Sequence, residues 1–293
     1  MATLNDYRNE RLRKLSELKS LGINPYPAKS FRDTKISDII DHFDEKQGST
    51  CTIAGRITAI RSFGKIAFIK IRDFSGEIQI FMQNPKNTEN TTENSPQSSI
   101  ISHSAENVKC DSELPQENTA NSNDLLNIKQ IKLLDTGDFI EARGIVQKSS
   151  TGEKSLFANF VRVLTKSLRP LPSYDGFTNK EERYRRRYVD MNVNTKVRER
   201  LVRRSKFWQA TRDFMNSHGF IEINTPVLEH TTGGADANPF VTHMDALDED
   251  FYLRISQELP LKRLLGGGFE KVYDIGPRFR NEGVDDEHLP EHI

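Results

Sequence analysis

The sequence predicts an α+β protein, with a small β-barrel in its first half and an antiparallel sheet toward its end. Two groups of short alternating strand patterns, at residues 51–82 and 137–168, predict the barrel. A long helical pattern at 194–219, followed by short strands and glycine-rich turns, predicts the second sheet. With 293 residues, the chain is long enough for about two domains of roughly 150 residues each.

Composition narrows the classes of protein to which the chain can belong. Charged residues make up 29% of the chain, and its apolar runs are far too short to span a membrane. The formal net charge is zero, so a nucleic-acid site would have to be a local patch. The N-terminal segment lacks the apolar core of a secretion signal. Cys51 and Cys110 predict neither a disulfide framework nor a metal site. We therefore expect a cytoplasmic protein that does not bind membranes.

Residues 1–48 are the predicted N-terminal helical region. The apolar face of its first helix comprises Leu12, Leu15 and Leu18. Asn5 or Asp6 is the predicted N-cap, and Gly22 is the predicted end. The helix either packs on its own domain or binds RNA or another partner.

Residues 49–171 are the predicted barrel domain. About five short strands, with a helix at 124–134 before the fourth strand, are typical of a Greek-key barrel of the OB type. Such barrels commonly bind single-stranded nucleic acid on one face.

A polar segment at about 84–124 interrupts the barrel. Asn, Ser and Thr supply 19 of these 41 residues, and the segment contains no Phe, Trp or Tyr. Such a composition buries too little apolar surface to offset the entropy of ordering, so it predicts a disordered insertion. Its seven acidic residues against two lysines argue against RNA binding.

Residues 172–293 are the predicted second domain. They begin with a basic run, Arg183 and Arg185–Arg187, which is usually a solvated helix face. After the long helix, the segment FIEINTPVLEH predicts a strand that Pro226 stops. The order of strands and helices indicates antiparallel pairing, and no glycine fingerprint of a dinucleotide or phosphate loop occurs.

The segment RFRNE, residues 278–282, is the strongest candidate for chemistry. In a strand, Arg278, Arg280 and Glu282 would share one face. They could form a surface ion-pair ladder, which contributes little stability. Alternatively, the planar guanidinium groups could grip carboxylate or phosphate oxygens in a bidentate way.

The order of several motifs resembles the class II aminoacyl-tRNA synthetases. Within that class, the chain resembles the bacterial type of lysyl-tRNA synthetase over nearly its whole length, apart from the polar segment. The segments that carry the resemblance are EERYRRRYVD (181–190), GGADANPFVTH (233–243), ALDEDFYLRI (246–255) and FRNEG (279–283). The resemblance implies an OB-fold anticodon-binding domain at 49–171. It also implies that 172–293 are the first part of an antiparallel-sheet catalytic domain, with motifs 1 and 2 only.

The resemblance also implies roles for residues of the second domain. Arg280 is the implied catalytic residue, which would hold both the amino-acid carboxylate and the α-phosphate of ATP. The other implied ligands are Gly234 and Glu258 for the amino acid, and Glu282 and His288 for ATP. Pro226 is the implied contact at a homodimer interface.

In the barrel, the resemblance implies an anticodon-reading set. Its members are Arg61, Phe68, Gln79 and Glu153. An aromatic ring can stack on an unstacked base while polar groups read base edges. Each position also has a structural alternative. Phe68 could belong to the barrel core, Glu258 could be a solvated helix charge, and Gly233 with Gly234 could form an ordinary turn.

The function implied is that of a lysine–tRNA ligase, with ATP, lysine and tRNA(Lys) as substrates. The family's third motif, its magnesium-ligating acids and the acid that recognises the lysine side chain would lie downstream. We therefore expect a C-terminally truncated chain with no metal ligand of its own, whose activity alone is in doubt. Two alternatives stay open: a non-catalytic tRNA-binding OB-fold protein, or an aspartyl or asparaginyl relative.

Overall fold

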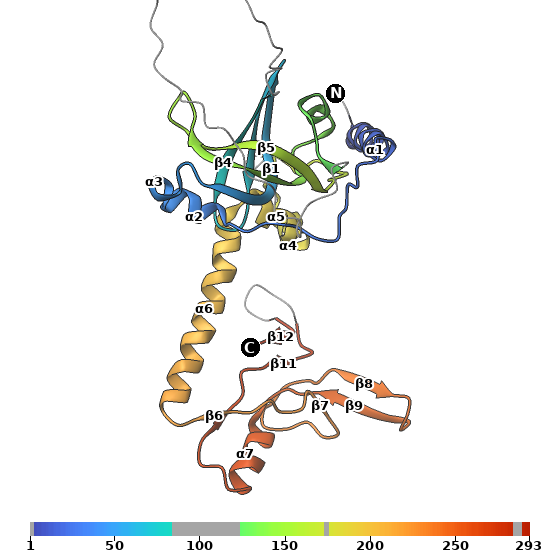
Figure 1. Cartoon of the computed structure of the whole chain (residues 1–293). Helices are drawn as coiled ribbons and strands as arrows, with labels where there is room; N and C mark the ends of the chain where they lie inside the picture. The colour runs from blue at the N-terminus through green and yellow to red at the C-terminus, as the bar shows by residue number, and fades with distance from the viewer. Residues whose placement is uncertain (1–2, 84–123, 173–175, 284–288) are drawn as a thin grey trace, which may run out of the picture. The chain divides into compact units, whose positions relative to one another are not determined.

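The computed structural model describes residues 3–83, 124–172, 176–283 and 289–293. The chain forms two compact units, Met1–Val193 and Asn194–Ile293 (Figure 1). The predicted domain boundary at 171/172 differs from this division and stays a prediction. The polar segment predicted to be disordered lies outside the described residues, except for Asp124. In the described part of the chain, no helix is long and apolar enough to cross a membrane.

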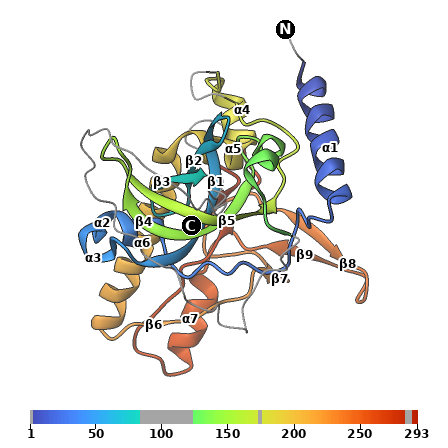
Figure 2. The same cartoon turned by 45° about the horizontal axis from the view of Figure 1, so that its top comes forward.

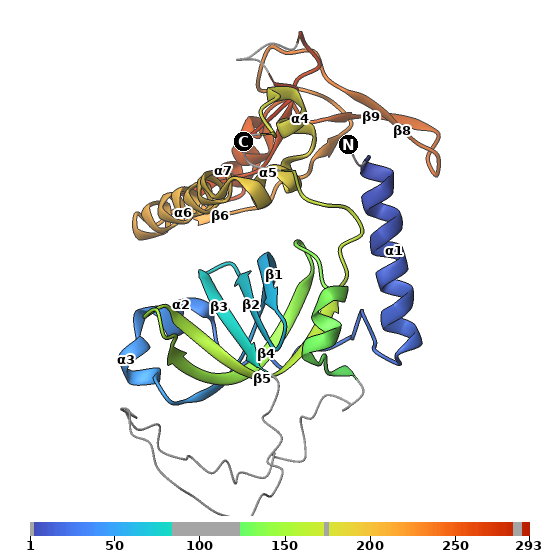
Figure 3. The ribbon, with the colours of Figure 1, turned by 90° about the horizontal axis from the view of Figure 1, so that it is seen from above.

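A closed five-stranded barrel forms the centre of the first unit (Figure 3). Its strands are β1 (Thr50–Phe63), β2 (Ile66–Arg72), β3 (Glu77–Gln83), β4 (Phe139–Lys148) and β5 (Lys154–Thr165). They follow the order β1-β2-β3-β5-β4, and parallel pairing of β3 with β5 closes the ring. The predicted OB-type barrel is confirmed.

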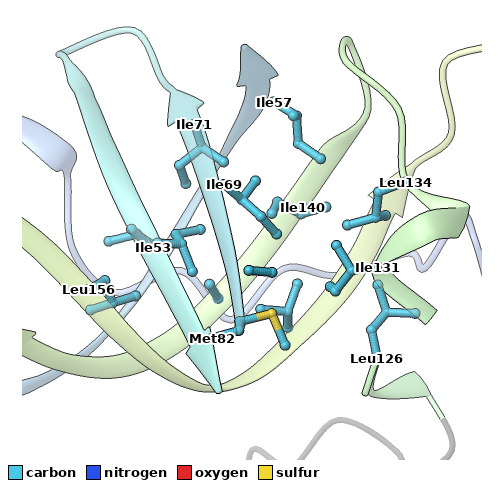
Figure 4. Packing of buried hydrophobic residues seen from close by; sticks show 14 of the residues in the cluster. Ile53, Ile57, Ile69, Ile71, Met82, Leu126, Ile131, Leu134, Ile140 and Leu156 are labelled. Carbon is cyan, nitrogen blue, oxygen red and sulfur yellow. The ribbon is translucent and has the colours of Figure 1, made fainter. Parts of the chain in front are cut away.

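Alternation along each strand builds the barrel core. On β2, Ala67, Ile69 and Ile71 are fully buried, while the residues between them face outward. Figure 4 shows buried side chains of different strands, including Ile53 and Ile140, pointing toward a common interior. The alternation read from the sequence therefore decides which residues the outer face carries.

The connection before β4 is a 3₁₀-helix, η2 (Ile128–Leu133), rather than the longer helix predicted at 124–134. Asn127 caps its start in a capping box with Gln130. Ile128 and Ile131 are both buried, because residues three apart eclipse in a 3₁₀-helix and so face the barrel together.

The first helix, α1 (Leu4–Ser20), contacts η2 and stands beside the barrel strands (Figure 2). Its N-cap is Thr3, which forms a capping box with Asp6, so the predicted cap at Asn5 or Asp6 is wrong. Arg11 is buried and donates to the backbone oxygens of Thr136 and Ser167, both at 2.9 Å. These contacts favour the interpretation that this helix packs on its own domain.

Short helices complete the first unit. They are α2 (Ile36–Asp41), α3 (Phe43–Lys46), α4 (Lys180–Arg185) and α5 (Arg187–Val193).

The basic run is balanced by acids of its own segment. Arg183 and Arg187 both pair with the buried Asp190, at 3.1 and 3.3 Å, and Arg185 pairs with Glu181 at 2.8 Å. These arginines are thereby occupied in local structure.

The second unit begins with the predicted long helix, α6 (Thr195–Ser217), which Asn194 caps. Its remaining elements are β6 (Ile221–Glu222), β7 (Leu228–Glu229), β8 (Val241–Met244), β9 (Glu249–Leu253), α7 (Glu258–Gly266), β10 (Val272–Tyr273), β11 (Arg278–Phe279) and β12 (Glu291–His292). A three-stranded antiparallel sheet has the order β7-β9-β8, and β6 pairs with β10 in parallel. The strand predicted at FIEINTPVLEH is thus two short strands separated by Pro226.

Candidate functional site

The outer face of the barrel carries two adjacent residues of the predicted base-reading set. Phe68 lies between buried residues of β2, so its ring points outward and is half-buried. The alternative that Phe68 belongs to the barrel core is therefore wrong. Arg61 on β1 is its direct register partner and is exposed. A ring and a guanidinium group thus lie side by side on this face.

The other two predicted residues share a pocket on the same barrel. Gln79 on β3 is the register partner of Lys70 on β2, and its amide donates to Oγ of Ser155 at 3.1 Å. Glu153, in the turn before β5, pairs with Lys70 at 3.3 Å, and both side chains are 44% exposed. Gln79, Glu153 and Lys70 line an open pocket of about 200 Å³.

In the second unit, Arg254 joins three segments of the chain. Its N–H donates to the oxygen of Val227 and its oxygen accepts from the N–H of Phe279, both at 2.9 Å. Its buried guanidinium pairs with Asp274 at 3.1 Å and donates to Oγ1 of Thr225 at 2.6 Å. Arg254 thereby fixes the segment that leads into RFRNE against the segment that contains Pro226.

Gly276 leaves room for the guanidinium of Arg254. A Cβ at this position would lie 2.3 Å from Nη2 of Arg254, which is closer than any real contact. Neither residue is predicted from the sequence. The signal that could have found Arg254 and its partner Asp274 is a single charge in each of two apolar strand patterns, LRI and YDI, since buried charges occur in opposite pairs.

The structure brings Gly234 and Glu258 together. Gly234 has a φ of +81°, and a Cβ there would lie 2.8 Å from Cβ of Glu258. The glycine is therefore required both by its backbone conformation and by close packing. Glu258 begins α7, is exposed and accepts a hydrogen bond from Lys262 one turn later. Its placement fits the solvated helix charge, and its substrate role stays a prediction.

The RFRNE segment is a strand for only two residues. β11 ends at Phe279, and Glu282 is exposed at a bend beyond it. The shared strand face predicted for Arg278, Arg280 and Glu282 therefore does not extend to Glu282. The ion-pair ladder is also wrong, because no ion pair among these three side chains occurs in the described structure. The N–H of Arg280 donates to the oxygen of Pro290 at 2.9 Å.

Two buried polar atoms of this unit have no hydrogen-bond partner within the described residues. They are Nε of Arg280 and Oε2 of Glu229. Burial raises the pKa of Glu229, although Arg254 and Arg263 partly oppose that shift. A buried donor without a partner costs about 1–3 kcal/mol. An acceptor on a ligand would recover that free energy at Arg280.

The remaining predicted residues are less informative. Pro226 is exposed, and its backbone oxygen accepts a hydrogen bond of 3.4 Å from Arg254. His288 lies outside the described residues. Thus Gly234 and Glu258 are in contact and Arg280 is tied to the same framework, whereas Glu282 is not held by any described hydrogen bond.

Two family models match the chain. The model described as "tRNA synthetases class II (D, K and N)" matches residues 179–293, and the model described as "OB-fold nucleic acid binding domain" matches residues 51–101. The chain therefore contains a class II tRNA synthetase domain and an OB-fold domain. The predicted family and fold class are confirmed.

The chain is also similar to curated lysine–tRNA ligases. It is 42% identical to that of Carboxydothermus hydrogenoformans over 98% of this chain and 52% of the relative. It is 41% identical to that of Azobacteroides pseudotrichonymphae over 96% and 52% of the two chains, and 39% identical to that of Thermotoga maritima over 98% and 52%. The chain therefore spans about half the length of the curated relatives it matches.

Proposed function

We propose that this class II synthetase chain acts in lysine–tRNA ligation, with lysine, ATP and tRNA(Lys) as substrates. The observation that carries the proposal is the similarity to lysine–tRNA ligases, which extends through the barrel and the second unit in one order. The lysine specificity and the roles of individual residues belong to this proposal.

The barrel would bind the anticodon through its outer face. Phe68 offers a half-buried ring for stacking, and its neighbour Arg61 offers an exposed cation. The exposed pair of Lys70 and Glu153 contributes about 0.2–1 kcal/mol at most, so a nucleotide could replace it at small cost. Gln79 then supplies an amide beside that position.

The second unit would take part in forming lysyl-adenylate. A carboxylate oxygen of lysine attacks the α-phosphorus of ATP, the bond to the bridging oxygen breaks, and pyrophosphate leaves. This step requires two anions to be held together and their developing charge to be neutralised. The guanidinium of Arg280 can donate to both, and its unpartnered Nε supports this role. The ribose hydroxyl of the tRNA 3′ end would then accept the lysyl group and release AMP.

Magnesium would normally accompany ATP in such a reaction. Among the residues whose structure is described, no cluster of three or more His, Cys, Asp or Glu side chains could hold a metal ion. No step is therefore assigned to the metal.

A homodimer is also part of the proposal. Phe207 and Phe214 are 62% and 60% exposed and lie two turns apart on α6. They offer an apolar surface to a second copy, and the exposed Pro226 is a further candidate contact. Sedimentation of the full protein and of a Phe207→Ser/Phe214→Ser variant tests this, with dissociation expected for the variant.

The test of the function is amino-acid-dependent ATP–pyrophosphate exchange by the protein that the gene encodes in full. Lysine should support exchange while aspartate and asparagine do not. Exchange with aspartate or asparagine would assign the protein to a different member of the class. Absence of exchange with all three, together with tRNA(Lys) binding by these 293 residues, would favour a non-catalytic tRNA-binding protein.

A further inference from the structure

One asparagine ties the end of the RFRNE segment to the loop that follows Gly234. The backbone N–H of Asn281 donates to the backbone oxygen of Asn238 at 2.8 Å, and the side-chain amide of Asn238 donates to the backbone oxygen of Asn281 at 3.1 Å. In a hydrogen-bonded pair of antiparallel strands, both of these bonds come from backbone N–H groups. Here the side chain of Asn238 supplies one of them, so the pair depends on the identity of this residue.

These two bonds fix the backbone immediately after Arg280. Before Arg280, the N–H of Phe279 donates to the oxygen of Arg254 at 2.9 Å. β11 ends at Phe279, so its pairing with β12 does not extend to Asn281. Within the described ranges, Asn238 is the only hydrogen-bond partner of the Asn281 backbone. The chain that carries Arg280 is therefore held before this residue by Arg254 and after it by Asn238.

The loop that ends at Asn238 begins at Gly234. The two residues are four positions apart, so their Cα atoms lie at most about 14 Å from each other. A Cβ on Gly234 would lie 2.8 Å from Cβ of Glu258, so the start of the loop packs on the first residue of α7. One short loop therefore contacts both the proposed ligands of the amino group and the segment of Arg280.

A second amide ties the beginning of the same segment. Gln257, the residue before Glu258, donates from its side chain to the backbone oxygen of Gly276 at 2.8 Å. Gln257 is buried, whereas Asn238 is exposed. Substitution of Gln257 would leave a cavity, but substitution of Asn238 removes one tie and leaves the packing of the unit in place.

We propose that Asn238 is a positioning residue that sets the distance between Arg280 and the ligands of the amino group, Gly234 and Glu258. The inference rests on the proposed function, because these ligand roles belong to it. An α-amino acid carries its amino group and its carboxylate on one carbon, so the ligands of the two groups must keep a fixed separation. A displacement of about 1 Å can lower a rate about 100-fold. Asn238 acts through Arg280 and touches neither substrate.

Lysine-dependent ATP–pyrophosphate exchange by the protein that the gene encodes in full tests this role. In Asn238→Ala, kcat/KM for lysine should fall about 10- to 100-fold, because Arg280 is no longer held at the required distance. Asp236→Ala is the matched control and should keep kcat/KM within about twofold. Asp236 is exposed in the same loop, and its side chain forms no hydrogen bond or ion pair to another described residue. Near-normal exchange by Asn238→Ala would overturn the proposal.

Competition by L-lysinol distinguishes positioning from general damage to the site. Lysinol keeps both ammonium groups of lysine, but a hydroxyl replaces the carboxylate that the guanidinium of Arg280 would bind. Its inhibition constant should agree within about twofold between wild type and Asn238→Ala, while KM for lysine rises. A variant that binds lysine and lysinol equally poorly has a distorted loop, which would overturn the proposal. Absence of competition in wild type would also overturn it, because the two sets of ligands would then not act separately.

Failure of the proposed function gives a different result. If wild type shows no exchange with lysine, the proposed function fails, and the role of Asn238 fails with it. If wild type exchanges with lysine and the two alanine variants behave alike, only the role of Asn238 is wrong. Circular dichroism should show the same thermal midpoint for both variants as for wild type. An Asn238→Ala protein that is unfolded at the assay temperature would assign the residue to stability and would contradict a positioning role.

Discussion

Arg254 and Asp274 form a buried ion pair in the second unit, with 3.1 Å between Nη1 and Oδ2 and each side chain only 2% exposed. Oγ1 of Thr225 donates to the same carboxylate oxygen at 2.5 Å. This ion pair therefore joins three segments: the one before Pro226, the end of β9, and the one that leads to Arg280. Arg254 contributes to the candidate site as a positioning residue.

Arg254→Ala should destabilise the second unit by about 3–5 kcal/mol, because it leaves a buried carboxylate without its counter-charge. Trp208 is the one tryptophan of the chain and lies on α6, so urea unfolding can be followed by its fluorescence. Lys262→Ala is the matched control. It removes a cation that is 65% exposed, and its effect should stay below about 1 kcal/mol. Equal effects of the two variants would contradict the role assigned to burial.

Gly144→Ala should distort the barrel. A Cβ at this position would lie 2.1 Å from the backbone oxygen of Phe157, and backbone cannot move aside as a flexible side chain can. The loss should reach or exceed the usual overpacking cost of about 1–3 kcal/mol. Because Ser155 on the same strand holds the amide of Gln79, binding of the anticodon stem-loop should weaken as well.

Gly76→Ala provides the comparison for this variant. The nearest atoms to its new Cβ are side-chain carbons of Ile36 and Ile40 at 3.3 Å, which can shift by a few tenths of an ångström. Thermal unfolding followed by circular dichroism should therefore show a much larger decrease for Gly144→Ala than for Gly76→Ala. Similar midpoints would show that β4 and β5 can separate at little cost.

Asp73 links stability to pH. Burial acts to raise the pKa of its carboxyl, but hydrogen bonds from Ser75, Gly76 and Ile36 outweigh burial and lower the pKa. A carboxyl whose pKa is lowered on folding contributes stability above its unfolded pKa of about 3.9 and loses it as pH falls through the folded value. The stability difference between wild type and Asp73→Asn should therefore be largest near neutral pH and shrink below about pH 4.

Urea titrations at a series of pH values, followed by far-UV circular dichroism, measure this difference. Asp44→Asn is the control, because its side chain is 92% exposed. A difference for Asp73→Asn that stays constant down to pH 2 would show that the folded carboxyl has no lowered pKa.

Local patterns in the sequence predict the barrel well. The period of two in IAFIKIR and EIQIFMQ decides which side chains face inward, and the structure follows it residue by residue. The same period places Phe81 on the face of Gln79. Phe157 could not be placed in this way, because its position beside Phe81 depends on the parallel pairing of β3 with β5 across a long connection.

The candidate site of the second unit is only partly predictable. The resemblance singles out Arg280, Gly234 and Glu258, and the structure adds that Gly234 packs directly on Glu258. The sequence does not predict that the strand ends at Phe279. The end of a strand depends on its pairing partner, which here is the two residues of β12. Nor could the sequence give Arg254, because a buried charge is recognised only once its counter-charge is in place.

Arg280→Lys should abolish most lysine-dependent pyrophosphate exchange by the protein that the gene encodes in full. Lysine keeps the positive charge, but it loses the planar fork and the Nε donor, which is buried and unpartnered among the described residues. Because the proposed anticodon surface lies on the barrel, binding of the anticodon stem-loop should be unchanged in the same variant. Arg278→Lys, on the preceding strand, is the matched control and should retain exchange. Near-normal exchange by Arg280→Lys would show that charge alone is sufficient there and would contradict the bidentate role of the guanidinium.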